Sequence, residues 1–82
     1  MVNLTPVACR AARAILGVTV RDLEERSGIA FATISKFENG RPMRESNKAK
    51  LVQVFEAAGV EILNGDAPGA RMKPPPQRAP AP

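Results

Sequence analysis

The stretch from Ser27 to Arg41 predicts a turn followed by one short helix whose outer face is suited to binding. On a helix that begins near Phe31, the side chains of Ile34 and Phe37 share the side that faces a core. The opposite arc then carries an aromatic, a small, a hydroxyl and a cationic side chain: Phe31, Ala32, Ser35 and Lys36. A lysine ammonium donates hydrogen bonds, and an outward aromatic ring can anchor a partner or fold back over the turn. This arc therefore predicts a contact surface.

Basic residues follow this helix directly. Arg41 and Arg44 stand in the next loop, where guanidinium groups can pair with phosphate oxygens. The chain of 82 residues has twelve Lys and Arg against eight Asp and Glu, a formal net charge of +4, which favours polyanionic partners. The other basic residues of the helical region are scattered in a way typical of solvated helix faces: Arg10, Arg21, Arg26, Lys48 and Lys50.

The composition argues against catalysis and against a metal or cofactor site. The chain has no His and a single cysteine, Cys9, which excludes an intramolecular disulfide and a multi-cysteine metal site. The adjacent acids Asp22, Glu24 and Glu25 have no base beside them, as is typical of a solvated helix face. We expect no enzyme activity, no metal and no cofactor, and we expect Cys9 to pack between helices.

The first predicted helix lies before the contact surface. Thr5 precedes Pro6, a capping residue followed by the residue favoured at the first helical position, and Gly17 ends the run. Residues at helical spacing predict its apolar side: Val7, Ala8, Ala11, Ala14 and Ile15.

Two short helices follow. Thr19 caps a helix over about residues 20–27, with Asp22 in the capping-box position. The next helix covers about residues 31–38 and is stopped by Asn39-Gly40, a pair suited to positive backbone φ.

A longer helix and a short β element complete the predicted fold. The helix covers residues 45–58 and carries one broad apolar stripe: Ala49, Leu51, Val52, Phe55 and Ala58. We expect an all-α fold, with a compact four-helix domain over 1–59, a short C-terminal strand or hairpin over 60–72 and a disordered Pro-rich tail over 73–82. We see no apolar run long enough to cross a bilayer and no signal region, so we expect a cytoplasmic protein with no membrane partner.

Two short helices joined by a Gly-containing turn, with one helix before them and one after, form a helix-turn-helix unit whose second member can enter a DNA major groove. Over roughly Leu4 to Ala58 the sequence also resembles the Cro and lambda-repressor type, or XRE, family of bacterial and phage helix-turn-helix regulators. The residues that carry the resemblance are Arg13, Gly17, Leu23, the turn from Ser27 to Ile29 and the motif from Ala32 to Gly40.

The resemblance implies DNA-contact roles. Outward positions of the recognition helix, over about 31–38, would touch base edges: Phe31, Ala32, Ser35 and Lys36. Lys36 can donate to guanine O6 or N7, while Phe31 and Ala32 can pack on thymine methyl groups. The candidates for phosphate contact are Thr19, Arg21, Thr33, Asn39, Arg41 and Arg44. In the family an Arg on the first helix commonly pairs with a Glu near the end of the recognition helix, which implies a structural ion pair between Arg13 and Glu38.

We therefore expect a sequence-specific regulator that binds double-stranded operator DNA as a homodimer on a palindromic site. Repression is the default mechanism, and the regulated genes can include the regulator's own gene. We expect Val60, Ile62 and neighbouring residues to form part of the dimer interface, either by strand pairing, which an exposed strand edge invites, or by packing on the helix over residues 45–58. One alternative stays open: a helix-turn-helix module, such as an antitoxin or anti-activator, that binds a protein partner. Three departures from the family pattern favour it: Val20 instead of Gln, Glu24 instead of a small residue, and Ala30 instead of a capping Ser or Thr.

Overall fold

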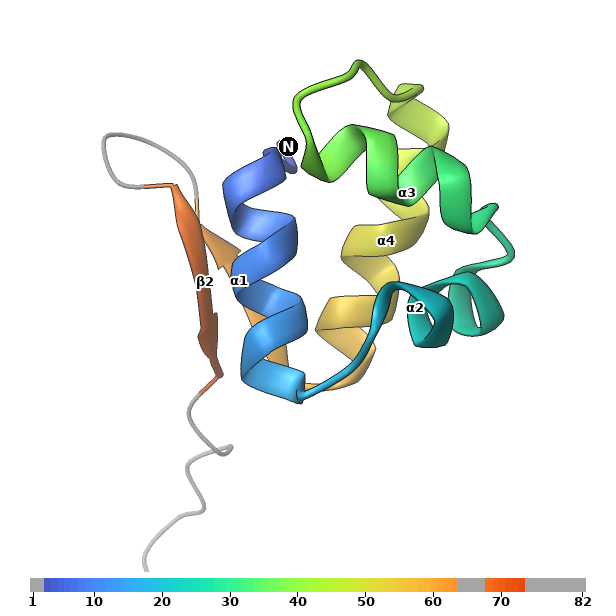
Figure 1. Ribbon diagram of the computed structural model, residues 1–82. Helices are drawn as coiled ribbons and strands as arrows, with labels where there is room; N and C mark the ends of the chain where they lie inside the picture. The colour runs from blue at the N-terminus through green and yellow to red at the C-terminus, as the bar shows by residue number, and fades with distance from the viewer. Residues whose placement is uncertain (1–2, 64–67, 74–82) are drawn as a thin grey trace, which may run out of the picture.

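Four helices and a two-stranded antiparallel hairpin make up the fold (Figure 1). The structure, a computed structural model, describes residues 3–63 and 68–73. The elements are α1 (Pro6–Leu16), α2 (Val20–Ser27), α3 (Phe31–Glu38), α4 (Glu45–Ala57), β1 (Val60–Leu63) and β2 (Gly69–Met72). The four predicted helices and the C-terminal hairpin are confirmed, whereas the predicted tail beyond Lys73 lies outside the described residues. None of the described helices is long and apolar enough to cross a membrane.

Side-chain caps explain where the first two helices begin. Thr5 Oγ1 accepts a hydrogen bond from the Ala8 N–H at 3.1 Å, so it satisfies one of the free donors at the start of α1. At the start of α2, Thr19 Oγ1 accepts from the Asp22 N–H at 3.1 Å, and the Asp22 carboxylate accepts from the Thr19 N–H at 2.9 Å. This reciprocal pair is the capping box that the sequence predicts.

One core joins all six elements. Its largest fully buried side chains are those of Leu4, Cys9, Leu23, Ile34, Leu51, Phe55 and Val60. Ala70 of β2 is partly buried and packs against this core. Both strands pack on α1, and β1 also contacts α4, so that the hairpin covers one side of the helical domain (Figure 1). In the strand register Val60 lies opposite Met72 and Ile62 lies opposite Ala70.

The inward face of α1 differs from the predicted one. Ala8, Cys9 and Ala12 are buried, while Val7 is 51% exposed and Ile15 is 38% exposed. Ala14 of α1 is exposed as well. On α4, Leu51 and Phe55 are buried as predicted, whereas Ala49 is exposed. The inward side of α1 consists of small residues, which allow close packing, and alanine spacing alone does not distinguish the two sides of a helix.

The hairpin is an integral part of the core. Val60 is 0% exposed and Ile62 is 6% exposed, because both side chains are covered by their own chain. These two side chains are therefore not available to a second copy, whereas dimerisation by pairing of strand edges stays a prediction. β1 contacts both α1 and α4, so the hairpin packs directly on the helical region, and the division of the chain at residue 59 stays a prediction.

Candidate nucleic-acid interface

The turn between α2 and α3 is fixed by side-chain hydrogen bonds. Ser27 Oγ donates to the Leu23 carbonyl at 2.6 Å and accepts from the Ile29 N–H at 3.1 Å. Gly28 adopts a left-handed backbone with φ of 77°, which favours glycine, and the Ile29 side chain is buried in the core. The direction of α3 relative to α2 is thus set by the turn itself.

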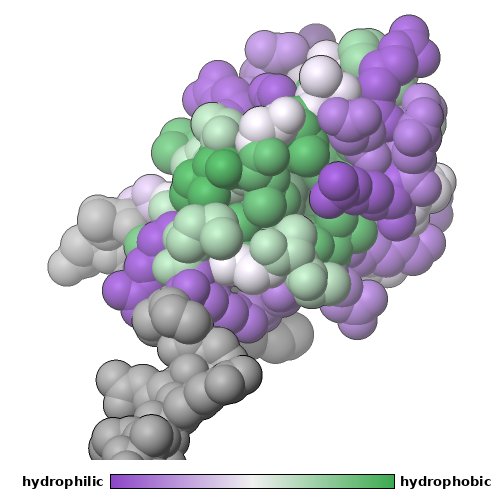
Figure 2. Space-filling view, turned by 90° about the horizontal axis from the view of Figure 1, so that it is seen from below, coloured by the Kyte–Doolittle hydropathy of each residue, from purple (hydrophilic) through white to green (hydrophobic). Residues whose placement is uncertain are grey.

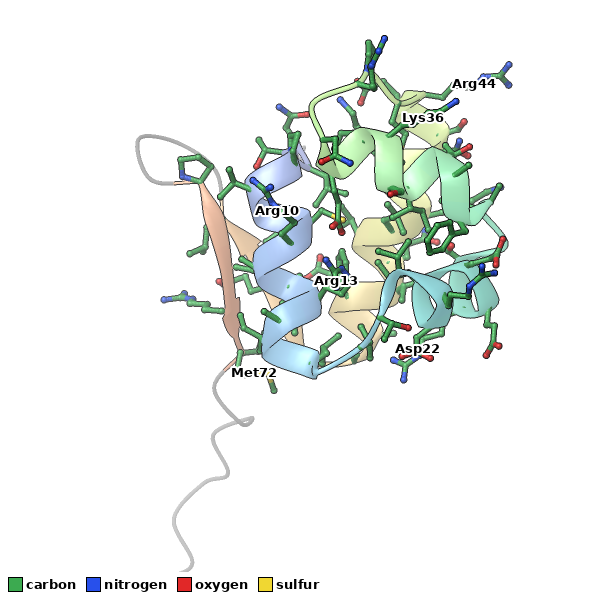
Figure 3. The ribbon with its side chains drawn as sticks, in the orientation of Figure 1. Arg10, Arg13, Asp22, Lys36, Arg44 and Met72 are labelled. Atoms are coloured by element: carbon green, nitrogen blue, oxygen red, sulfur yellow. The ribbon has the colours of Figure 1, made fainter. Side chains whose placement is uncertain are left out.

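The outer face of α3 is arranged as the sequence predicts, with differences in exposure. Ile34 and Phe37 are buried, while Ala32 and Lys36 are exposed. Phe31, Thr33 and Ser35 are half-buried. Lys36 lies together with Arg44 at the upper side of the molecule in Figure 3, and both side chains point away from the core.

The candidates for phosphate contact fall into two groups. Arg41 and Arg44 are exposed in the loop after α3 and form no ion pair within residues 3–63 and 68–73. Asn39 is exposed at the end of α3, and its side-chain amide donates to the Ser35 carbonyl at 2.9 Å. Asn39, Arg41 and Arg44 therefore lie at the same end of α3 as Lys36 or in the loop that follows.

The start of α2 forms the second group and lies elsewhere. The labelled side chain of Asp22 marks the first turn of α2 on the lower side of Figure 3, apart from Lys36 and Arg44. Thr19 belongs to this turn, where its hydroxyl oxygen accepts from the backbone and its O–H remains able to donate. Arg21 is instead drawn toward the start of α3, because its guanidinium lies 4.6 Å from the centre of the Phe31 ring.

A partly buried ion pair fixes the end of α3 to α1. Arg13 Nη2 donates to Glu38 Oε1 at 2.8 Å and Arg13 Nε donates to Glu38 Oε2 at 3.0 Å, so the pair is bidentate. Arg13 also reaches the carbonyl of Val18 at 3.5 Å. The pairing that the resemblance implies is present, and the Glu38 hydrogen bond raises the pKa of Arg13.

Cys9 is a third member of this cluster that sequence reasoning missed. Its Sγ donates to Glu38 Oε2 at 3.3 Å. Burial, followed by the negative charge of Glu38, raises the pKa of the Cys9 thiol far above its ordinary value, so the thiol stays protonated and unreactive. The four-residue spacing of Cys9 and Arg13, which places both on one side of α1, is the sequence signal that could have indicated this contact.

The first turn of α3 depends on another contact that sequence reasoning missed. Ala30 stands at the cap position and offers no side-chain hydrogen bond. The Phe31 N–H instead donates to Glu24 Oε2 at 2.9 Å, from the outer side of α2. The signal in the sequence is the coincidence of two departures, a missing cap at residue 30 and an added carboxylate at residue 24.

The described charges favour an anionic partner at the α3 side of the molecule. Most carboxylates are engaged in caps or ion pairs: Asp22, Glu24, Glu38, Glu45, Glu56 and Glu61. Several cations form no ion pair within the described part of the chain: Arg10, Arg26, Lys36, Arg41, Arg44 and Lys50. Three of these, Lys36, Arg41 and Arg44, lie on α3 or in the loop that follows it. Among the described residues no group of three or more His, Cys, Asp or Glu side chains can hold a metal ion.

Comparison with known proteins identifies the segment that contains α2, the turn and α3. The model of the helix-turn-helix family matches residues 10–63, which run from α1 to β1 and include all of α2 and α3. No curated protein matches the chain. The matched segment therefore contains the Arg13–Glu38 ion pair, the turn between α2 and α3 and the exposed face of α3.

Proposed function

Because the chain belongs to the Cro/C1-type, or XRE, helix-turn-helix family, we propose that it is a sequence-specific transcription regulator whose recognition helix is α3. The observation that carries the proposal is the exposed face of α3, which is fixed to α1 by the Arg13–Glu38 pair and followed by arginines that form no ion pair among the described residues. A rigidly held helix with an outward polar face is what reading of the major groove requires.

In this proposal the residues divide into base readers and phosphate contacts. The base readers are Ala32, Ser35 and Lys36, with Phe31 at the margin because Arg21 covers its ring. Lys36 donates to guanine, and the small or hydroxyl side chains beside it contact neighbouring base edges. Phosphate contacts come from Arg21, Thr33, Asn39, Arg41 and Arg44, and from Thr19 where the DNA extends along the start of α2.

We propose that the regulator works as a homodimer whose interface lies on the side formed by α1 and β2. The large apolar side chains that are most exposed in the described chain all belong to these elements: Val7, Ile15 and Met72. Figure 2 shows apolar side chains gathered on the face of the molecule that is seen from below. Met72 lies at the end of the molecule opposite Lys36 (Figure 3), so a two-fold axis on this side leaves the Lys36 face of each copy uncovered and available to DNA.

The default mechanism is repression by occupation of a promoter. Two recognition helices that enter successive major grooves are about 34 Å apart, which requires a palindromic operator. An operator next to the regulator's own gene gives autoregulation through protein concentration.

The alternative of a protein-binding module loses part of its support. Of the three departures that favour it, Glu24 and Ala30 compensate each other, since Glu24 supplies the hydrogen bond that Ala30 lacks. Val20 is half-buried and packs against the core.

The test is selection of DNA duplexes from a randomised pool by the full chain. We expect enrichment of a palindrome with half-sites spaced by one helical turn, about 10 base pairs. A pool that stays random after repeated rounds, with retention that disappears at higher salt, would contradict the proposal.

A further inference from the structure

The recognition helix begins without a cap of its own. Ala30 has an extended backbone, with φ of −57° and ψ of 140°, but its methyl side chain accepts no hydrogen bond. The first N–H groups of a helix have no partners within the helix, and uncapped helix starts fray. For α3 this is a functional matter, because its first turn carries Phe31 and Ala32.

Glu24 replaces the missing cap from a different helix. Its Oε2 accepts from the Phe31 N–H at 2.9 Å, seven residues further along the chain. A carboxylate at this place also interacts favourably with the positive end of the helix dipole. The contact therefore joins the middle of α2 directly to the first residue of α3.

Arg21 completes the cluster on the solvent side. Its Nη1 lies 3.9 Å from Glu24 Oε1, and its guanidinium lies over the Phe31 ring at 4.6 Å. The side chain of Glu24 is 38% exposed, so it is held between backbone and guanidinium while it keeps some contact with water. The first residue of α3 is thus held through both its N–H and its ring.

We propose that Glu24 is a positioning residue for operator recognition: it fixes the first turn of α3 in the orientation in which its side chains meet base edges. The inference rests on the proposed function of α3. If the first turn of α3 is frayed, it has to become ordered when DNA binds, and this costs conformational entropy. The cost lowers affinity only for DNA whose bases this turn contacts. Non-specific binding through phosphate contacts does not depend on it.

The experiment compares five full-length chains that differ at residues 24, 25 and 30: wild type, Glu24→Ala, Glu24→Gln, Glu25→Ala and the double variant Glu24→Ala/Ala30→Ser. Glu25→Ala is the matched control, since it removes the same charge from an exposed neighbour on α2 that has no hydrogen bond or ion pair among the described residues. Two quantities are measured: hydrogen exchange of the Phe31 amide without DNA, and the ratio of affinities for the selected duplex and a scrambled duplex.

Loss of Glu24 should accelerate exchange of the Phe31 amide and lower the affinity ratio by roughly 2- to 30-fold, the factor that corresponds to the free energy of one helix cap. Glu24→Gln keeps an acceptor oxygen and should stay close to wild type, as should Glu25→Ala. In the double variant the hydroxyl of the introduced serine caps the following N–H groups, so the affinity ratio should recover although the Phe31 amide stays unprotected.

Two results would overturn the inference: identical behaviour of Glu24→Ala and Glu25→Ala, or a double variant no better than Glu24→Ala alone. Failure of the proposed function is distinguishable, because wild type would then bind selected and scrambled DNA equally. In that case Phe31 exchange alone decides whether Glu24 caps the helix: protection lost only in the Glu24→Ala chains supports capping, and unchanged protection overturns it.

Discussion

At the scale of single residues, Glu38 connects the fold to the DNA-facing surface. Its carboxylate is bound by two nitrogens of Arg13 and by the Cys9 thiol, so one buried acid at the end of α3 holds two side chains of α1. The Arg13–Glu38 pair could be predicted from the sequence through a family resemblance. The contacts of Cys9 and Glu24 were not predicted, because the signals for them in the sequence show only that a contact is possible, while the contacts themselves join residues 29 and 7 positions apart.

Glu38→Ala should lower the free energy of unfolding by about 3 kcal/mol, because Arg13 is left without its partner in a largely buried site. The side chain of Glu38 is 8% exposed and that of Arg13 is 26% exposed. Chemical denaturation measures the change. Glu61→Ala is the control, since it breaks the more exposed pair with Arg71 and should lower the same free energy by less than about 1 kcal/mol. Equal effects of the two variants would contradict a structural role for Glu38.

Lys36→Ala should reduce affinity for the selected duplex by about 1–3 kcal/mol and relax base preference at one position of each half-site. Arg41→Ala should weaken binding to every sequence to a similar extent and make the affinity less dependent on salt. Arg26→Ala, at an exposed position of α2 that forms no ion pair among the described residues, removes the same unit of charge and is the control. If Lys36→Ala and Arg41→Ala changed cognate and scrambled binding alike, the division between base and phosphate contacts would be wrong.

At the scale of elements, local chemistry sets where helices begin and end. The starts of α1 and α2 were predictable because Thr5 and the Thr19–Asp22 pair satisfy N–H groups within a few residues. The inward face of α1 was not, because its inward and outward sides both contain alanines and only packing distinguishes them. The place of the hairpin was missed for a similar reason: a short apolar strand looks the same whether it packs on its own chain or on another.

The capping box of α2 predicts a pH dependence of stability. Hydrogen bonds from the Thr19 backbone and side chain lower the pKa of Asp22, so the ionised carboxylate stabilises the folded chain above its unfolded pKa, about 3.9. This stabilisation is lost as the pH falls through the folded pKa. Asp22→Ala should therefore lower the melting temperature at neutral pH and have a smaller effect in strong acid. A melting difference that is the same at both pH values would show that the charge of Asp22 does not matter.

At the scale of the whole molecule, the arrangement separates three surfaces. The face with Lys36 and Arg44 is basic, the hairpin closes the core behind α1, and the exposed apolar side chains lie on α1 and β2. Composition indicated the basic character of the chain but not its location. The apolar surface could not be located from sequence, because it depends on which side of α1 faces inward.

Met72→Glu should convert the proposed dimer into a monomer without unfolding it. The side chain of Met72 is 53% exposed, so a charge is tolerated in the isolated chain but repelled within an apolar two-fold interface. Sedimentation equilibrium measures the change, and Ala49→Glu, at an exposed position of α4, is the control. A wild-type chain that is monomeric, or a Met72→Glu chain that remains dimeric, would exclude this interface.

The most direct test of the account is a fluorescence titration of the full chain against the selected duplex and its scrambled counterpart at two salt concentrations. A sequence-specific regulator should prefer the selected duplex by roughly 10³-fold or more, and a clear preference should remain at the higher salt concentration. Equal affinity for the two duplexes, with a similar steep loss of both on addition of salt, would contradict operator recognition by α3.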